Sequence, residues 1–472
     1  MTNAETAGVR LASRSIVQVT ARLVALAALA AQLAVAARFL TPVDLGTFVA
    51  ALAVLGIAGA FSEFGLTNTI VLSLSGGRNP ASVLADAIRA SVILCGLSMV
   101  GSVLAGWFVL DGDLWVIVCL IPWFIVSRAA IPLQGFAQWQ HRFPRIATAD
   151  ALGRSTAALV TLVGWQLGSG LSGSSRLAVV CGALFVGSLV SLGLLANVGV
   201  RPAAGGRAWL LIRDALPIGM TNGASYVHSR IDQVILGAFG YRRVLASYGV
   251  AYRVVDASLA AALGIATIAL PVLGRADQDE RADIGTMLGG LVGALAFGLG
   301  VLVFWLAEPI VVILGGSEYR DAAPLLRLLA PVLVVSLLNM VPAHLALVHD
   351  RASTLMRVAI GLLVVNVAVN LVLVPAHQAK GAAVASIITE SLGLICVSWV
   401  AARAMDGRIP WGPALATVVG FLLVTTGASL LRPVSPILVA AAVCVGVGIT
   451  SVGLAQPLKL LVHDARRSKA KT

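Results

Sequence analysis

Long apolar runs, broken by short clusters of Gly, Pro, Asp and Arg, dominate the chain. A membrane-spanning helix needs about 20 mostly apolar residues, and the runs reach that length. They lack the alternation of period two that barrel strands show, so they predict helices. The first series of helices is expected near residues 15–39, 45–74, 83–110, 113–138, 146–169 and 176–198. The second is expected near 212–238, 244–273, 285–307, 322–347, 354–375 and 379–404, with two further helices near 411–431 and 435–455.

Composition supports an all-α integral membrane protein with about 14 transmembrane helices. Of the 472 residues, 59% are apolar and 11% charged, whereas soluble domains average about 45 to 50% and about 25%. Almost no chain is left for a soluble catalytic or nucleotide-binding domain. The sequence has no phosphate-binding loop of the form GxxxxGK[ST], no HExxH motif and no CxxC pair, so we expect no bound ATP, no metal site and no resident cofactor.

An internal repeat divides the chain. Phe39 and the following segment LGTF at 45–48 reappear 200 residues later as Phe239 and LASY at 245–248. Because six helices per repeat is an even number, the two copies have the same orientation, and we expect two parallel six-helix repeats that form two bundles around a central cavity. The expected domains are residues 1–200, residues 201–404, two extra transmembrane helices in 405–456 and a basic cytoplasmic tail in 457–472.

The formal net charge of +12 comes from basic residues that are spread singly along the chain. Such spacing argues against a nucleic-acid surface. Most Arg and Lys residues outside the spans fall in loops on the side of the N-terminus, which predicts cytoplasmic N- and C-termini. The expected location is therefore the bacterial cytoplasmic membrane, with multiple spans, and membrane lipids are expected to contact the basic tail.

Several ionisable residues fall inside the predicted spans, where each costs at least about 2.5 to 3.5 kcal/mol on insertion scales. Antiparallel neighbouring helices place residues equidistant from their turn at equal depth. The depth-matched pairs are Arg22 with Glu63, Asp232 with Arg253, Arg230 with Asp256, and Asn366 with Glu390, with Asn370 on the same face as Asn366. One interpretation is structural: the pairs neutralise each other and fix the register of the helices.

The alternative interpretation is functional. Guanidinium groups bind phosphate oxygens bidentately and keep their charge when buried. The candidate phosphate-binding residues are Arg22, Arg230, Arg253 and, ranked lower because it has no partner in its own hairpin, Arg128. Candidates for charge partners or for coupling to an ion are Glu63, Asp232, Asp256 and Glu390. The candidate sugar-contacting aromatics are Tyr226, Tyr248 and Tyr252, for which an interfacial role is the alternative.

Five motifs resemble the polysaccharide flippases of the multidrug/oligosaccharidyl-lipid/polysaccharide (MOP) exporter superfamily, the Wzx-type proteins. They are ARFLTPVDLGTF at residues 37–48, FSEFGL at 61–66, QWQHRF at 138–143, RIDQVILG at 230–237 and GAAVA at 381–385. The resemblance extends through residue 404. It implies no enzymatic activity but alternating-access export of a polyprenyl-(pyro)phosphate-linked glycan from the inner to the outer leaflet, with Arg22 and Arg253 facing the cavity. No arginine lies in the body of the second helix, where some relatives have one.

The resemblance also implies a driving force from a Na⁺ or H⁺ gradient or the membrane potential. Other polysaccharide-assembly proteins are candidate partners. Three alternatives stay open: a cation-coupled multidrug extruder of the same superfamily, a lipid II flippase, and a passive scaffold of an envelope-assembly complex. A membrane-embedded glycan-processing enzyme would need a substantial outer loop, and the longest one, residues 308–321, is short.

Overall fold

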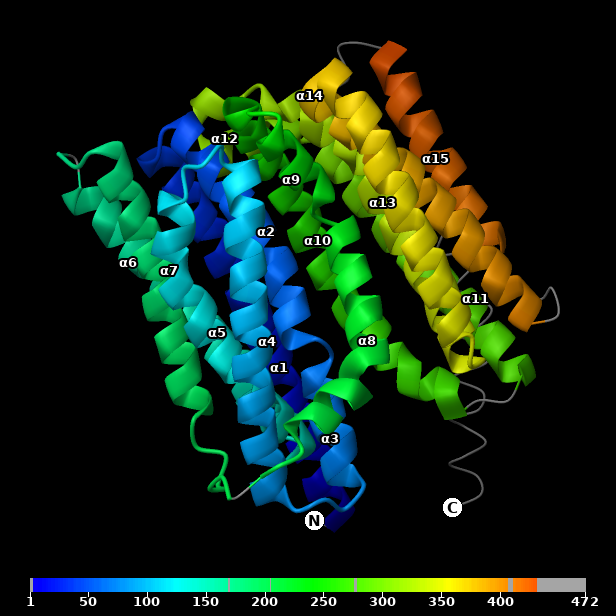
Figure 1. The fold of residues 1–472 in the computed structure, drawn as a ribbon. Coiled ribbons are helices and arrows are strands. Elements are labelled where there is room, and N and C mark those ends of the chain that lie inside the picture. Colours follow the sequence, from blue (N-terminus) through cyan, green and yellow to red (C-terminus); the bar gives the residue numbers. More distant parts are fainter. Residues whose placement is uncertain (1–2, 169, 204, 276–277, 406–410, 431–472) are drawn as a thin grey trace. The chain divides into compact units, whose positions relative to one another are not determined.

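The protein is α-helical throughout the residues that the computed structural model describes, which are 3–168, 170–203, 205–275, 278–405 and 411–430 (Figure 1). The helices up to the middle of the chain are α1 (Asn3–Phe39), α2 (Pro42–Glu63), α3 (Leu66–Ser75), α4 (Pro80–Val109), α5 (Trp115–Trp139), α6 (Phe143–Leu167), α7 (Gly173–Leu195), α8 (Ala208–His228) and α9 (Ile231–Ala238). They are followed by α10 (Arg242–Arg275), α11 (Gln278–Trp305), α12 (Ala307–Gly315), the short 3₁₀ helix η1 (Ser317–Tyr319), α13 (Ala322–Val348), α14 (Ala352–Ala404) and α15 (Trp411–Leu430).

Nine helical segments in the described part of the chain are long and apolar enough to cross a membrane. Their number and apolar length indicate a multi-pass, all-helical membrane protein. The segment Pro80–Val109 illustrates the pattern, because only 28% of its most apolar window is buried inside the protein. Its outward side chains, such as Val92 and Phe108, are exposed and apolar, as lipid-facing residues are. The helix expected at 435–455 and the basic tail at 457–472 lie outside the described residues.

Capping residues explain where several helices begin. Thr41 precedes Pro42, the first residue of α2, and its hydroxyl accepts a hydrogen bond from the Asp44 amide at 3.2 Å. Asn79 does the same for α4, accepting from the amide of Ala81 at 2.9 Å. A side-chain acceptor followed by proline is a strong helix start, because the acceptor satisfies a free amide and proline has none to satisfy.

The first compact unit comprises residues Met1–Gly249 together with Ile313–Glu318. Within it, α6 packs against both α1 and α7, and α2 packs against α4, α5, α8 and α9. The short segment 313–318 is fixed to this unit by Arg38, whose guanidinium donates to the main-chain oxygens of Ile313 and Leu314 at 2.8 and 3.1 Å. Arg38 thereby satisfies carbonyls at the end of α12, which have no partner within the helix.

Two of the expected helices in this unit are broken. The segment predicted at 45–74 divides into α2 and α3 at Phe64 and Gly65, which have φ values of 43° and 70°. Gly65 also lies against Ile218 of α8, where a Cβ atom would stand 2.8 Å from the Ile218 side chain. The segment predicted at 212–238 divides into α8 and α9 at Ser229 and Arg230. These breaks expose main-chain groups that a continuous helix would satisfy internally.

The second compact unit comprises Val250–Val312 and Tyr319–Thr472. In it α13 packs against α11 and α14, and α15 packs against α11. The packing of α15 uses two glycines: a Cβ on Gly420 would stand 3.3 Å from the ring of Phe297, and one on Gly300 would stand 3.1 Å from the ring of Phe421. Small residues at such positions let helices in a membrane approach closely. The division into domains at residues 200 and 404 stays a prediction.

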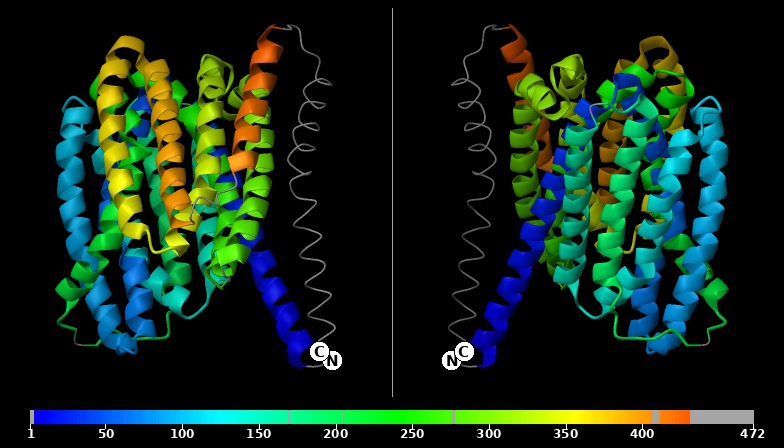
Figure 2. Two further views of the ribbon diagram at one scale, coloured as in Figure 1. Left: turned by 90° about the vertical axis from the view of Figure 1, so that its right-hand side faces the viewer. Right: turned by 90° about the vertical axis from the view of Figure 1, so that its left-hand side faces the viewer.

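The helices expected at 354–375 and 379–404 are the two arms of α14. They are joined at Gln378, the single residue with non-helical backbone angles (φ 52°, ψ −130°) inside the element. The arms run side by side (Figure 2), and a hydrogen bond of 2.9 Å from the Asn366 amide to the Thr389 hydroxyl links them. Gly381 follows the turn and lies against the main chain of Leu373, so a side chain at 381 would not fit.

Candidate functional site

Arg128, the lowest-ranked of the candidate phosphate-binding arginines, lies at the centre of the best-defined polar cluster. Arg128 belongs to α5, between Pro122 and Pro132. Proline lacks an amide proton, so the main-chain carbonyl of Arg128, four residues before Pro132, loses its helical partner. Both prolines also favour bending of the helix. The half-buried charge of Arg128 therefore lies on a helix whose backbone is locally opened.

Three contacts hold the Arg128 guanidinium. Its Nη1 donates to the main-chain oxygen of Gly59 in α2 at 3.1 Å, and its Nε donates to the Ser127 hydroxyl at 3.3 Å. The guanidinium carbon lies 5.6 Å from the centre of the Phe124 ring, within cation–π range. A Cβ atom on Gly59 would stand 3.2 Å from Nη1, so glycine at this position leaves room for the guanidinium.

Glu63, Tyr226 and Cys95 lie near enough to act electrostatically on the charge of Arg128. They come from α2, α8 and α4, so four helices contribute to the cluster. Tyr226 lies against α2, where a Cβ on Gly56 would stand 3.2 Å from its hydroxyl oxygen. The Glu63 carboxylate accepts a hydrogen bond from Thr67 at 3.3 Å. The structure thus brings together Arg128, Glu63 and Tyr226, which the sequence analysis proposed for three different roles.

Arg22 is exposed on α1, and no carboxylate in the described part of the chain lies within ion-pairing distance of it. Its depth match with Glu63 therefore does not produce an ion pair in this conformation. Glu63 instead faces the surroundings of Arg128. An exposed guanidinium in an apolar span is free to turn toward a ligand or toward lipid headgroups.

Asp232 is buried in the first turn of α9. Its carboxylate accepts hydrogen bonds from the Tyr248 hydroxyl and, at 2.7 Å, from the amide of Gln233. Arg230 and His228 act electrostatically on it. The buried carboxylate is therefore held by two hydrogen-bond donors, with the Arg230 guanidinium acting on it as well, as a buried carboxylate requires.

Arg253 and Asp256 form an ion pair at 3.8 Å within α10, three residues apart. Their side chains are 27% and 22% exposed. The sequence-based matching assigned Asp256 to Arg230 and Asp232 to Arg253, whereas a contact along one helix was not considered. Such contacts between residues three or four apart are common on helices.

The polar group in α14 is centred on asparagine side chains. Asn366 donates to Thr389, and Asn370 donates to Asn366 Oδ1 at 2.8 Å. The expected partner across this hairpin was Glu390, the residue next to Thr389. Glu390 is half-buried and has contacts of its own. In this hairpin Asn366 thus meets the residue next to the expected one, and one residue turns the side chain by about 100° around a helix.

The three tyrosines proposed for sugar contact differ in exposure. Tyr226 is 40% exposed beside Arg128, whereas Tyr248 is fully buried against Asp232 and Tyr252 is also buried. Within the residues that the structure describes, no group of three His, Cys, Asp or Glu side chains is arranged to hold a metal ion. The Arg128 cluster presents a positive charge with hydrogen-bond donors beside an exposed tyrosine.

The sequence analysis missed Gly59, Ser127 and Phe124 as parts of this cluster. Gly59 contributes a main-chain oxygen, and because every residue has one, the sequence does not indicate which of them binds a side chain. Phe124 precedes Arg128 by four residues on the same helix face, so the spacing was a usable signal. The Gly56 and Gly59 pair in α2 was another, because small residues spaced by a helical turn mark close approach of a neighbour.

Comparison with known structures identifies the fold. The lipid II flippase MurJ in an inward closed conformation matches with a TM-score of 0.72 at 12% identity, over 95% of this chain and 99% of that one. An inward-facing multidrug resistance MATE family transporter of the MOP superfamily matches with a TM-score of 0.66 at 15% identity, over 83% and 98%. A MOP superfamily transporter from Pyrococcus furiosus matches with a TM-score of 0.54 at 14% identity, over 83% and 96%.

No curated protein matches the sequence. The fold is that of MurJ and of the MATE transporters of the MOP superfamily, which confirms the expected fold. A family model described as "Polysaccharide biosynthesis protein" matches residues 35–324, more than half of the 472 residues. The chain therefore belongs to the polysaccharide biosynthesis protein family, with the fold of the MOP superfamily.

Proposed function

We propose that the protein is an alternating-access flippase that moves a polyprenyl-(pyro)phosphate-linked glycan from the inner to the outer leaflet for synthesis of a cell-surface polysaccharide. The observation that carries the proposal is the Arg128 cluster: a guanidinium set in an apolar helix, held by a main-chain oxygen and an aromatic ring, with Tyr226 exposed beside it. The family and the fold support the same cargo class.

The chemistry of Arg128 suits a phosphate. Its hydrogen bonds in this conformation are made with neutral oxygens, those of Gly59 and Ser127, and a phosphate oxygen would replace a neutral acceptor by a charged one. Hydrogen bonds between charged partners are roughly twice as strong as neutral ones. The positive charge also favours an anionic headgroup over a cationic drug, which is the cargo class expected of the extruder alternative.

Arg22, Arg230 and Arg253 are the further phosphate-binding candidates in this proposal. Glu63, Asp232, Asp256 and Glu390 are the candidates for charge partners or for coupling to Na⁺, H⁺ or the membrane potential. The proposal includes 14 transmembrane helices, with two parallel six-helix bundles around a central cavity. It places the protein in the bacterial cytoplasmic membrane with both termini in the cytoplasm. Partners would be the lipid-linked glycan, membrane lipids and other polysaccharide-assembly proteins.

The test is mass spectrometry of polyprenyl-linked sugars in cells depleted of the protein, combined with a probe that reports which leaflet holds them. Accumulation of one lipid-linked glycan on the cytoplasmic side supports flipping and names the cargo, and accumulation of lipid II would select the lipid II alternative. Wild-type levels of lipid-linked sugars, together with new sensitivity to cationic drugs, would contradict the proposal and favour an extruder. Complementation with Arg128→Gln, compared with Arg154→Gln, connects the phenotype to the cluster.

A further inference from the structure

The linker between α7 and α8, residues 196–203 and 205–207 of the described chain, is hydrogen-bonded to neighbouring segments near both of its ends. At its start, Arg145 of α6 donates to the main-chain oxygens of Leu194 and Asn197 at 2.8 and 2.6 Å. Gln140 donates to the oxygen of Val198 at 2.8 Å. This linker, called the strap below, joins the last helix of the first repeat to the first helix of the second.

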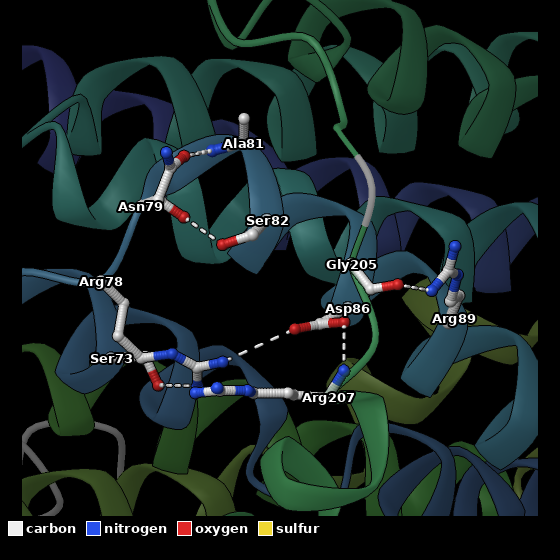
Figure 3. Close-up of polar contacts among 9 residues, drawn as sticks. All are labelled: Ser73, Arg78, Asn79, Ala81, Ser82, Asp86, Arg89, Gly205 and Arg207. Atoms are coloured by element: carbon white, nitrogen blue, oxygen red, sulfur yellow. Dashed lines mark hydrogen bonds and ion pairs between the residues drawn. The ribbon is translucent and has the colours of Figure 1, made fainter.

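The far end of the strap lies on α4 (Figure 3). The amide of Ala203 donates to the oxygen of Ala81 at 3.1 Å, and the Arg89 guanidinium donates to the oxygen of Gly205. The amide of Arg207 donates to Oδ1 of Asp86 at 2.9 Å. Helix α8 begins one residue later, at Ala208.

Asp86 is the buried centre of this arrangement, since only 1% of the residue is exposed. Its Oδ2 lies 3.5 Å from Nη2 of Arg78, and Arg78 in turn donates to the Ser73 hydroxyl at 3.5 Å. A buried carboxylate is tolerated only when donors and a counter-charge satisfy it. Here the strap supplies one donor and Arg78 supplies the charge, so loss of the strap would leave Asp86 partly unsatisfied.

Asp86 also completes the N-terminus of α8. Arg207 is the N-cap residue of that helix, and its own side chain makes no capping hydrogen bond. In a capping box, an acidic side chain within the helix accepts from the N-cap amide. Asp86 makes this contact from another helix, and its negative charge lies at the positive end of the α8 dipole.

Gly205 is the residue that lets the strap approach. A Cβ at 205 would stand 2.6 Å from Asp86 Oδ1 and 3.1 Å from the Ala85 side chain, whereas a Cβ at Gly206 would meet nothing within 4 Å. Neither glycine has a φ in the left-handed region, so the two positions differ in space and not in backbone demands. Gly206 is therefore a matched control for Gly205.

We propose that Asp86 is a positioning residue that binds the strap and thereby holds the start of α8 on α4. Gly205 has no side chain and so leaves room for the Asp86 carboxylate. Helix α8 carries Tyr226, so the strap fixes one end of the helix that borders the Arg128 cluster. The fastening at this end uses hydrogen bonds and one ion pair, and Arg89, Ala203 and Arg207 are exposed. Val198 of the strap and Leu211 of α8 are buried in one apolar cluster with Leu84 of α4, so the polar contacts of Asp86 add to an apolar attachment.

Hydrogen–deuterium exchange mass spectrometry on the full-length protein in detergent or nanodiscs tests the proposal. In Asp86→Ala, amides of the strap and the first turn of α8 are expected to exchange about tenfold faster than in the wild type, the effect of losing a typical cap. Asp86→Asn keeps an acceptor for the Arg207 amide and is expected to lose less protection. Peptides from α13 report global unfolding and are expected to stay unchanged.

Substitutions of Gly205 and Gly206 give a second test of the proposal that does not depend on the Asp86 variants. Gly205→Ala is expected to speed exchange in the same peptides, and Gly206→Ala is expected to match the wild type. Equal exchange in Gly205→Ala and Gly206→Ala, or wild-type exchange of the strap in Asp86→Ala, would overturn the proposal. Because no transport is measured, this result does not depend on whether the proposed cargo is correct.

Discussion

The guanidinium of Arg128 donates a 3.1 Å hydrogen bond to the main-chain oxygen of Gly59. In a regular helix that oxygen accepts from the amide four residues later, which is that of Glu63. Arg128 therefore adds a second donor to one carbonyl and connects α5 to α2 close to Glu63. The contact is easily exchanged, because the carbonyl keeps its helical partner when the guanidinium turns to another acceptor.

Arg128→Gln is expected to lower transport of the lipid-linked glycan by about 10- to 100-fold. The reason is the loss of a hydrogen bond from a charged group, worth about 1.5 to 3 kcal/mol, at the proposed phosphate position. Arg128→Lys keeps the charge but loses the planar guanidinium. Its transport rate is therefore expected to lie between those of the wild type and Arg128→Gln. Transport is measured by accumulation of the glycan in the outer leaflet of cells or vesicles.

Arg154→Gln is the control for this change. Arg154 pairs with Asp150 at 2.8 Å on α6, with both side chains largely exposed, and such pairs contribute little. If the Arg128→Gln protein transports the glycan at the wild-type rate, Arg128 is not part of the phosphate site.

Tyr248→Phe is expected to lower the free energy of unfolding by about 1 to 3 kcal/mol. The substitution removes the hydroxyl that donates to the buried Asp232 carboxylate, and a buried acceptor without its donor keeps its desolvation cost. Tyr241→Phe is the comparison, because its hydroxyl makes no hydrogen bond with a described residue. Equal unfolding curves for the two variants in detergent would show that Asp232 does not depend on Tyr248.

The Arg253–Asp256 pair is expected to contribute less than about 1 kcal/mol to stability. The side chains are partly exposed and the atoms are 3.8 Å apart, and exposed ion pairs are weak. A double-mutant cycle of Arg253→Gln and Asp256→Asn measures the coupling by unfolding. If Arg253 binds phosphate, Arg253→Gln lowers transport more than stability, and Asp256→Asn does not reproduce that loss. A coupling well above 1 kcal/mol with unchanged transport would identify a structural pair.

Phe421→Ala is expected to destabilise the second unit by about 3 to 5 kcal/mol, the range for large aromatic truncations in a packed setting. Phe421 is 3% exposed and packs against Gly300 of α11. Leu423→Ala, two residues further on at 67% exposure, is expected to stay within about 0.5 kcal/mol of the wild type. Similar losses in both variants would contradict the packing of α15 on α11.

Apolar run length predicted most of the helices, because a span in lipid must satisfy its backbone internally and so shows itself as a long apolar run. The breaks after Glu63 and Ser229 were not predicted, because each lies within a run that is long enough for one span. Polar residues stand at both breaks, Glu63 at the first and Ser229 and Arg230 at the second. At the first break Phe64 and Gly65 both have a positive φ, and only the glycine is a residue type that indicates such a turn. The partner of Arg128 was also missed. Matching depths across a hairpin compares neighbouring helices only, whereas α2 and α5 meet through the fold.

Depth alone does not give the direction of a side chain. Asn366 faces Thr389 and not Glu390, and Arg253 finds Asp256 on its own helix. Side-chain direction depends on helix rotation, which packing decides and a single sequence does not record. For the same reason, Gly205 and Gly206 look alike in the sequence, although only one of them lies against Asp86.

The reversal of the chain at Gln378 also constrains how the protein is made. The two apolar arms are joined by one non-helical residue, so the hydrophilic segment between them is only a short turn with His377, Gln378 and Lys380. Such a turn gives the insertion machinery little chain to hold in water while the first arm settles in lipid. The hydrogen bond between Asn366 and Thr389 satisfies polar groups of both arms only once they are together. We expect these two helices to enter the bilayer as one hairpin, so that a nascent chain truncated at the turn inserts poorly and one that includes both arms inserts well.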